Sequence, residues 1–144
     1  MARAEIKLPN KFIDSLEKAS NEIHSIAGDA LKAGAAVVEP RMRTNLSGAI
    51  GRTKRPTEST GQLLSALGTS PVGVTGRGTI NVKVGFAENR RDGVSHAKIA
   101  TVLEYGSTRQ PARPFLAPTR AQTRSGAVKA MKQTMSEKLK GLQP

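Results

Sequence analysis

The chain has 144 residues, enough for one domain, and its 23 lysines and arginines against 11 aspartates and glutamates give a net charge of +12. It has no cysteine, which excludes disulfides, thiol catalysis and cysteine-based zinc sites, and no apolar run approaches the length of a membrane-spanning helix. The N-terminal residues lack the apolar segment of a signal peptide. So basic a chain is expected to bind polyanions or acidic protein surfaces.

A long helix is predicted to begin near Pro9 and Asn10. Its apolar residues recur at alternating steps of four and three and form one stripe: Phe12, Leu16, Ala19, Ile23, Ile26 and Ala30. Pro40 is expected to kink or end this helix. The apolar face is expected to resume around it, at Val37, Val38, Met42 and Leu46. The stripe could form a coiled coil, but we expect it to pack on the sheet of the same domain.

A loop, a short helix and a hairpin are predicted next. Residues 47–59 are rich in Gly, Ser, Thr and charge and are expected to be flexible. Thr60 is predicted to cap a short helix that ends at Gly68 and uses Leu63, Leu64 and Leu67 as apolar contacts. Residues 71–74 and 79–86 flank Thr-Gly-Arg-Gly and predict a hairpin, in which Ile80, Val82 and Val84 alternate with polar residues.

The C-terminal third is predicted to be mostly helical. Residues 87–95 read as a second flexible loop. Residues 96–105 fit either a short helix or a strand, and we favour a helical turn. A second long helix is predicted from Thr119 to Leu142, with one apolar face formed by Ala127, Val128, Met131, Met135 and Leu139. The fold class is therefore α+β: a small, mostly antiparallel sheet packed against a long N-terminal helix and a C-terminal helix, in a single structural domain spanning residues 1–144.

Groups suited to catalysis are sparse. His24 and His96 are isolated from each other and lack the spacing of a metal site, so we expect neither a metal nor a cofactor. The glycines of the hairpin do not form a phosphate-binding loop, because no helix opens after them. A hydrolase centred on Glu104 would need a second acid nearby. We expect instead that Glu104 forms an ion pair with Arg109 or Arg113 and that the protein is not an enzyme.

The segment Glu104–Pro118, here called the motif segment, is stiff. Pro111, Pro114 and Pro118 fix their own backbone angles and push the preceding residues toward extended geometry. Gly106 permits a backbone reversal, and Phe115 is the large apolar group that can pin the segment to the sheet. Its candidate motif and interface residues are Glu104, Tyr105, Gly106, Arg109, Pro111, Arg113, Pro114 and Phe115.

Part of this sequence resembles a family of phage proteins. The stretch VLEYGSTRQPARPFLAPT, Val102 to Thr119, resembles the hallmark segment of the gene-product-ten-like family of long-tailed phages. TGQLLSAL, Thr60 to Leu67, is similar to that family's Thr-Gly-x-Leu-x-x-Ser step. HAKIATVLEYG is similar to its Tyr-Ala-x-x-Val-Glu-aromatic-Gly pattern, with His96 in place of the usual aromatic residue.

The resemblance implies a virion structural protein, a neck or tail-completion component assembled in the host cytoplasm. Such a protein would form a homo-oligomeric ring, a hexamer, around the DNA passage at the head–tail junction. Its partners would be the adjacent head-closure and tail-terminator or tail-tube proteins, with non-specific contact to the viral DNA in the channel and no contact with a membrane. The alternative from the charge alone is a stand-alone basic nucleic-acid-binding protein, whose affinity would fall steeply with salt.

Overall fold

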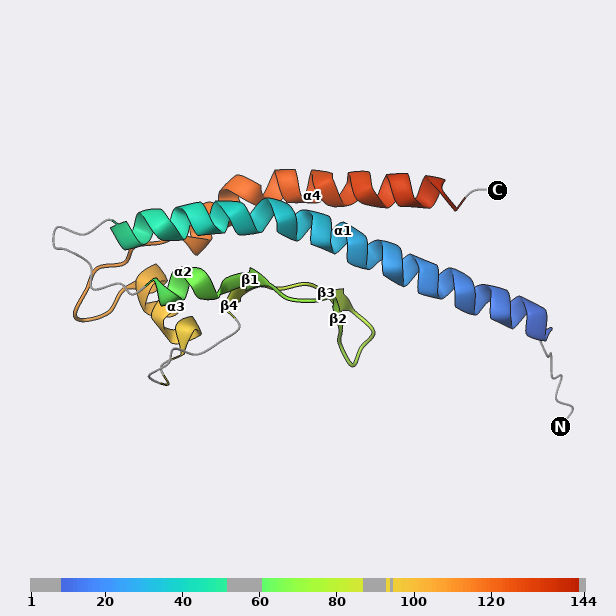
Figure 1. Cartoon of the computed structure of the whole chain (residues 1–144), viewed down its shortest axis with the longest axis horizontal. Helices are drawn as coiled ribbons and strands as arrows, with labels where there is room; N and C mark the ends of the chain where they lie inside the picture. The colour runs from blue at the N-terminus through green and yellow to red at the C-terminus, as the bar shows by residue number, and fades with distance from the viewer. Residues whose placement is uncertain (1–8, 52–60, 87–92, 94, 143–144) are drawn as a thin grey trace, which may run out of the picture.

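Two long helices, two short helices and a hairpin make up the chain in the computed structural model (Figure 1). The structure describes residues 9–51, 61–86, 93 and 95–142. The predicted flexible loops at 47–59 and 87–95 therefore lie mostly outside the described residues, as does the predicted cap Thr60. The α+β class predicted from the sequence is confirmed: helices dominate, and the only strands of the described ranges pair in antiparallel fashion.

The first helix, α1 (Asn10–Gly51), is longer than the sequence suggested. It begins where predicted and continues through Pro40 for 42 residues, with a bend part-way along it that is visible in Figure 1. Of the two predicted effects of Pro40, ending the helix is wrong, and bending is the effect expected of a proline inside a helix. Residues 47–51, predicted as part of a loop, form the last turn, in which Ala49 is buried.

The hairpin contains two short ladders. Strand β1 (Leu67–Thr69) pairs with β4 (Val84–Phe86), and β2 (Gly73–Val74) pairs with β3 (Ile80–Asn81). Three residues separate β1 from β2, but only two separate β3 from β4, so the first side of the hairpin has an extra residue around Pro71. Proline cannot donate a ladder hydrogen bond, and this irregularity accommodates it.

Short helices α2 (Gln62–Ala66) and α3 (His96–Tyr105) flank the hairpin in the chain. The predicted short helix after residue 60 is confirmed, but Gly61, with a positive φ of 74°, precedes it, and it ends at Ala66. Leu67 is a strand residue opposite Phe86, so its predicted place in the helix is wrong, but its role as a buried apolar contact beside Leu63 is confirmed. The helical turn predicted at residues 96–105 is confirmed as α3.

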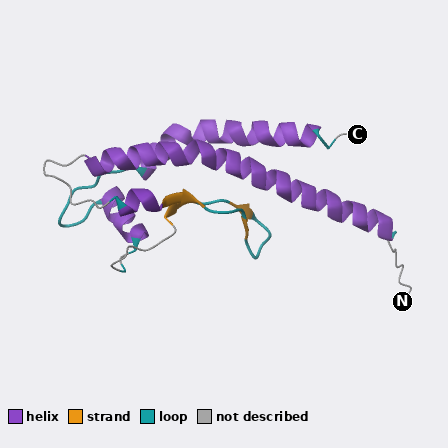
Figure 2. Ribbon diagram, viewed as in Figure 1, coloured by secondary structure: helices purple, strands orange, loops and turns teal. Residues whose placement is uncertain are grey.

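The last helix, α4 (Leu116–Lys140), runs antiparallel to α1 and lies on the side of α1 away from the hairpin (Figure 2). It begins three residues before the predicted Thr119. Its predicted apolar face is only partly correct: Ala127 is buried and Met131 half-buried, whereas Val128, Met135 and Leu139 are exposed. Thr119 and Thr123 are buried instead. Their hydroxyls can be buried because they donate hydrogen bonds to the carbonyls of Phe115 and Thr119, one turn earlier.

The core lies at the end of the molecule where α2, α3, the hairpin and the last turns of α1 meet. Its buried residues come from all of these elements and from the position just before α4: Met42, Leu46, Ala49, Leu63, Leu67, Ala100, Leu103 and Phe115. Val84 and Phe86 of β4 pack against this core from the hairpin. The core therefore brings the motif segment into contact with three other parts of the chain.

The opposite end of α1 has no such surroundings. Residues 10–25, here called the arm, are exposed throughout, and burial begins at Ile26. The prediction that the stripe packs on the sheet of its own domain is wrong for Phe12, Leu16 and Ile23, which are exposed. From Ile26 onward α1 is partly buried, and α4 rather than the sheet provides much of the cover, since Gly34 lies against Met131 and Val37 against Gly126. None of the described helices is both long and apolar enough to span a membrane.

Candidate interface site

The N-terminus of α4 receives its cap from a distant residue, Glu104. Phe115 occupies the cap position and has no side-chain acceptor to offer. Instead the carboxylate of Glu104 accepts hydrogen bonds from the backbone N–H groups of Phe115, Leu116 and Ala117, at 2.7, 2.8 and 3.1 Å. The next residue is Pro118, which has no N–H. All four positions that normally leave unsatisfied donors at a helix start are thereby accounted for.

Glu104 is a buried acid that remains ionised at neutral pH. Burial of the carboxyl raises its pKa, but the three backbone hydrogen bonds and the positive charge of Arg120 outweigh this effect, and the pKa lies below its ordinary value. The anion also sits at the positive end of the α4 dipole. The predicted ion pair with Arg109 or Arg113 is wrong, because a bare helix start supplies stronger and closer donors. A carboxylate held this way is poorly suited to act as a general base.

Gly106 makes the sharp reversal that leaves α3. Its φ of 80° and ψ of 178° lie in a region that essentially only glycine adopts. A Cβ at this position would lie 2.7 Å from the backbone nitrogen of Ala112, so no side chain fits. The chain then forms a tight turn in which Ser107 and Gln110 exchange backbone hydrogen bonds.

Arg113 ties the returning chain to two helices. Its backbone N–H donates to the carbonyl of Leu103 at 2.7 Å, and its guanidinium donates to the carbonyl of Ala49 at 3.2 Å. Ala49 lies in the last turn of α1, where unsatisfied carbonyls and the negative end of the helix dipole attract a cation. Arg113 therefore stabilises the fold rather than offering its charge to solvent.

Phe115 is the anchor of the motif segment. Its side chain is fully buried, and its ring meets that of Phe86 in β4 edge to face, with the ring centroids 6.3 Å apart. The predicted role of pinning this segment to the sheet is confirmed. Glu104, Gly106, Arg113 and Phe115 thus form the inner half of the motif segment.

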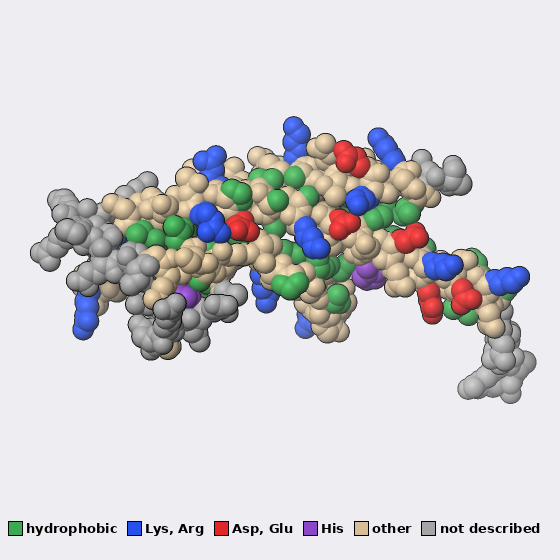
Figure 3. All heavy atoms as spheres, viewed as in Figure 1, with side chains coloured by type: hydrophobic (Ala, Val, Ile, Leu, Met, Phe, Trp, Pro, Cys, Tyr) green, Lys and Arg blue, Asp and Glu red, His purple; other side chains and the backbone are tan. Residues whose placement is uncertain are grey.

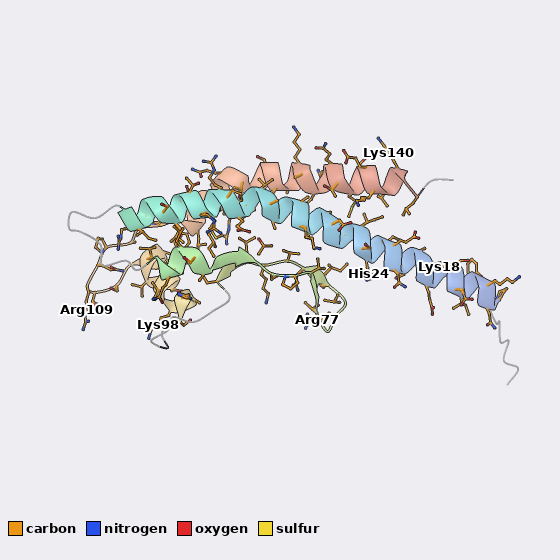
Figure 4. All side chains as sticks on the ribbon, viewed as in Figure 1. Lys18, His24, Arg77, Lys98, Arg109 and Lys140 are labelled. Atoms are coloured by element: carbon orange, nitrogen blue, oxygen red, sulfur yellow. The ribbon has the colours of Figure 1, made fainter. Side chains whose placement is uncertain are left out.

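The outer half faces solvent. Tyr105 is 78% exposed, although it is the only tyrosine of the chain, and Arg109 projects from the turn at the end of the molecule (Figure 4). Pro111 and Pro114 are also exposed. Tyr105 is the last residue of α3, and the other three residues lie on the following loop, whose two ends are fixed by Glu104, Arg113 and Phe115. Their prediction as contacts for a neighbour remains a prediction, and the geometry is compatible with it.

A second polar cluster, which the sequence did not suggest, joins α1 to the start of the hairpin. Arg43 donates to Glu39 and to the carbonyls of Leu64 and Leu67, and the hydroxyl of Thr69 donates to Glu39 at 2.6 Å. The hydrogen bond from Thr69 and then that from Arg43 lower the pKa of Glu39 against the opposing effect of burial. The spacing of Glu39 and Arg43 on one helical face was the only signal available in the sequence.

The two histidines are far from each other. His24 is exposed on the arm, where its Nδ1 lies 2.7 Å from the carbonyl oxygen of Ser20, and His96 is buried at the start of α3. In the parts of the chain that the structure describes, no three His, Asp or Glu side chains come together as metal ligands could. What the motif segment can do is structural: it holds a stiff loop against the core and presents Tyr105 and Arg109.

A comparison with models of protein families finds one that covers residues 10–106. It is the HK97-gp10-like family, described as "Bacteriophage HK97-gp10, putative tail-component". The chain belongs to the HK97-gp10-like family. The searches of curated proteins and of solved structures found no match.

The match to the HK97-gp10-like family includes α1, the hairpin and α3 through Glu104, Tyr105 and Gly106. It ends before the Pro-Ala-Arg-Pro-Phe block at residues 111–115. The resemblance noted from the motif segment is confirmed at the level of the family. Its description groups the members with phage tail components, which supports a structural role in a phage and a place in the virion.

Proposed function

We propose that this protein is a neck or tail-completion component of a long-tailed phage. In this proposal it forms a closed hexameric ring around the DNA passage at the head–tail junction, next to head-closure and tail-terminator or tail-tube proteins. It acts by assembly alone and catalyses no reaction.

The observation that carries the proposal is the two-sided construction of the motif segment. Its inner half is fixed by the carboxylate of Glu104, the guanidinium of Arg113 and the buried ring of Phe115. Its outer half exposes Tyr105 at the end of α3 and Arg109 on the stiff loop that follows. A loop held rigid before it meets a neighbour loses little conformational entropy on binding, which favours a joint between proteins. Tyrosine and arginine are also the residue types that contribute most to such interfaces.

The surface charge is consistent with DNA passing close by. Arg77 at the tip of the hairpin, Lys98 on α3 and Arg109 lie on the hairpin side of the molecule, and Lys140 lies on the α4 side (Figure 4). Positive charge spread in this way attracts phosphates without reading a base sequence. We therefore expect contact with DNA in the channel to be non-specific.

Cryo-microscopy of phage particles that carry the protein tests the location. We expect density for the two long helices, repeated around the channel between head and tail. A protein found as single copies along packaged DNA, away from the junction, would contradict the proposal. The net charge of +12 favours that second candidate, a stand-alone nucleic-acid binder.

Salt separates the two candidates in solution. A stand-alone binder loses DNA affinity steeply as salt rises, with a slope set by the number of phosphates it contacts. A ring of highly basic subunits repels itself, and moderate salt screens charges over roughly 8–10 Å, so self-association should improve. Native mass measurement at low and moderate salt, with and without DNA, reports both effects.

A further inference from the structure

The arm exposes an apolar stripe for which nothing in the described part of the chain provides cover. Phe12, Leu16 and Ile23 are 49%, 51% and 54% exposed. With Ala19 they lie on one side of the helix, at steps of four, three and four residues. A stripe of this kind in water favours a partner helix.

The same stripe is covered a little further along α1, and α4 is the element that lies there. Gly34 of α1 lies against the side chain of Met131, and Asp29 forms a 3.4 Å ion pair with Lys138. α4 ends at Lys140, and the arm, which is exposed throughout, extends past the end of α4 in Figure 1. The arm therefore continues a surface that already accepts a helix bearing apolar and basic residues.

The side of α4 that does not face α1 carries a second exposed stripe. It is formed by Ala121, Val128, Met135 and Leu139. A shallow depression surrounds Val128, and Arg124, Lys129 and Lys132 line it. Here called the outer stripe, this surface combines the two features that α4 presents to α1: small or flexible apolar groups with basic residues beside them.

The charges of the two surfaces are complementary. Within α4 six residues are basic and Glu137 alone is acidic, whereas the arm, in a strongly basic chain, has more acidic than basic residues. Figure 3 shows acidic side chains interspersed with basic ones along α1, and predominantly basic ones along α4. Glu22 lies seven residues before Asp29, on the same edge of the stripe, and so occupies the position equivalent to the acid that pairs with Lys138.

We propose that the arm of one copy of this chain docks along the outer stripe of α4 in a second copy. The contact is heterologous, because each subunit gives its arm to one neighbour and receives an arm from another, and such a contact closes into a ring when the rotation permits. The alternative is that the arms of two copies pair with each other. That pairing is less favourable, because a second arm presents the same acidic edge and lacks the cations beside Val128. The inference rests on the ring proposed above and names the surfaces that join its subunits.

The chain has no cysteine, so introduced cysteines report the contact cleanly. Single-cysteine variants Leu16→Cys and Val128→Cys, distinguished by mass, are mixed at high protein concentration and oxidised gently. We expect the mixed disulfide dimer to exceed each like-with-like dimer several-fold. Asn21→Cys, on the opposite side of the arm, is the matched control and should give several-fold less mixed dimer with Val128→Cys. Equal yields from the two arm positions, or a predominance of Leu16–Leu16 dimers, would overturn the proposal.

Charge reversal provides a second readout. Glu22→Lys should reduce the multimer several-fold at fixed concentration, and adding Lys132→Glu should restore it. Asp14→Lys makes the same charge change on the face away from the stripe and should leave assembly nearly unchanged. Equal losses from Glu22→Lys and Asp14→Lys, or no recovery with Lys132→Glu, would count against the docking.

The double variant Leu16→Cys/Val128→Cys extends the test to phage particles. We expect a series of disulfide-linked multimers after oxidation. A ring seen at the head–tail junction without these cross-links would overturn the docking and leave the proposed function intact. Cross-linked multimers formed by a protein absent from the junction would support the docking and overturn the proposed function.

Discussion

The two ends of α1 carry the same apolar pattern and have opposite surroundings. Near the C-terminal end, Met42, Leu46 and Ala49 are buried by α2, α3 and the motif segment. Near the N-terminal end, Phe12, Leu16 and Ile23 remain exposed, although they form an equally regular stripe. The apolar pattern thus specifies which side of a helix avoids water. Whether burial of that side stabilises the fold or an assembly depends on which neighbours cover it.

Substituting the two phenylalanines compares these ends most sharply. Phe115→Ala should lower the free energy of unfolding by about 3–5 kcal/mol, because it removes a fully buried ring and leaves a cavity beside Phe86. Phe12→Ala, on the arm, removes the same side chain from a half-exposed position and should cost less than about 1 kcal/mol. Urea unfolding followed by circular dichroism measures both. Equal midpoints for the two variants would contradict the contrast.

The cap of α4 gives the next largest effect. Glu104→Gln should cost about 2–3 kcal/mol at pH 7, because an amide replaces the charge that three N–H groups bond. Glu17→Gln on the arm is the matched control and should be nearly neutral. An unfolding midpoint for Glu104→Gln equal to that of the control would show that the cap contributes nothing.

The loss of stability in Glu104→Gln is expected to depend on pH. The folded-state pKa of Glu104 lies below its ordinary value of 4.5, so its contribution to stability is complete above about pH 4.5 and is lost as the pH falls through the folded-state pKa. The stability difference between wild type and Glu104→Gln should therefore shrink in acid.

Gly106 tests the reversal after α3. Gly106→Ala should cost about 1–3 kcal/mol through backbone strain alone, with the 2.7 Å approach to Ala112 adding to it. Gly76→Ala, in the hairpin turn, meets no atom within 4 Å of the new Cβ and should change stability far less. Thermal unfolding of both variants makes the comparison, and similar melting temperatures would contradict it.

The smallest effect on folding is expected within the stripe of the arm. Leu16→Ala should change the unfolding free energy of the isolated chain by less than about 0.5 kcal/mol, because the side chain is half exposed. Its self-association, followed by sedimentation, should nevertheless weaken. A large loss of stability in a monomeric sample would mean that the arm packs within its own chain.

Much of the fold could be read from periodicity. The start of α1 and the hairpin around Thr75–Gly78 follow from apolar spacing and turn residues, whereas the spacing in residues 96–105 fits a strand as well as the helix that forms there. The ends of elements were less accurate. Pro40 did not stop α1, because the buried residues on both sides of it outweigh one missing hydrogen bond. Leu67 moved from helix to strand because Phe86 pairs with it across the hairpin.

The candidate site was predictable in its residues but less so in their partners. Phe115 as an anchor follows from its size among three prolines, and Gly106 from the reversal it permits. The partner of Glu104 was missed because capping normally comes from an adjacent Ser, Thr, Asp or Asn. The absence of such a residue before α4, in the sequence Arg-Pro-Phe-Leu-Ala-Pro, was the available sign that a distant acceptor was needed.

The remote cap also fixes an order of events when the protein is made. Glu104 leaves the ribosome before the helix it caps, so the acceptor can already be in place on α3 when the first turn of α4 emerges. The first turn of α4 has no side chain of its own to accept hydrogen bonds from its N–H groups. Without those N–H groups, burial of the Glu104 carboxylate at the end of α3 would cost free energy. The end of α3 and the start of α4 therefore open and close together as one cooperative unit, although nine residues separate Gly106 from Leu116 along the chain.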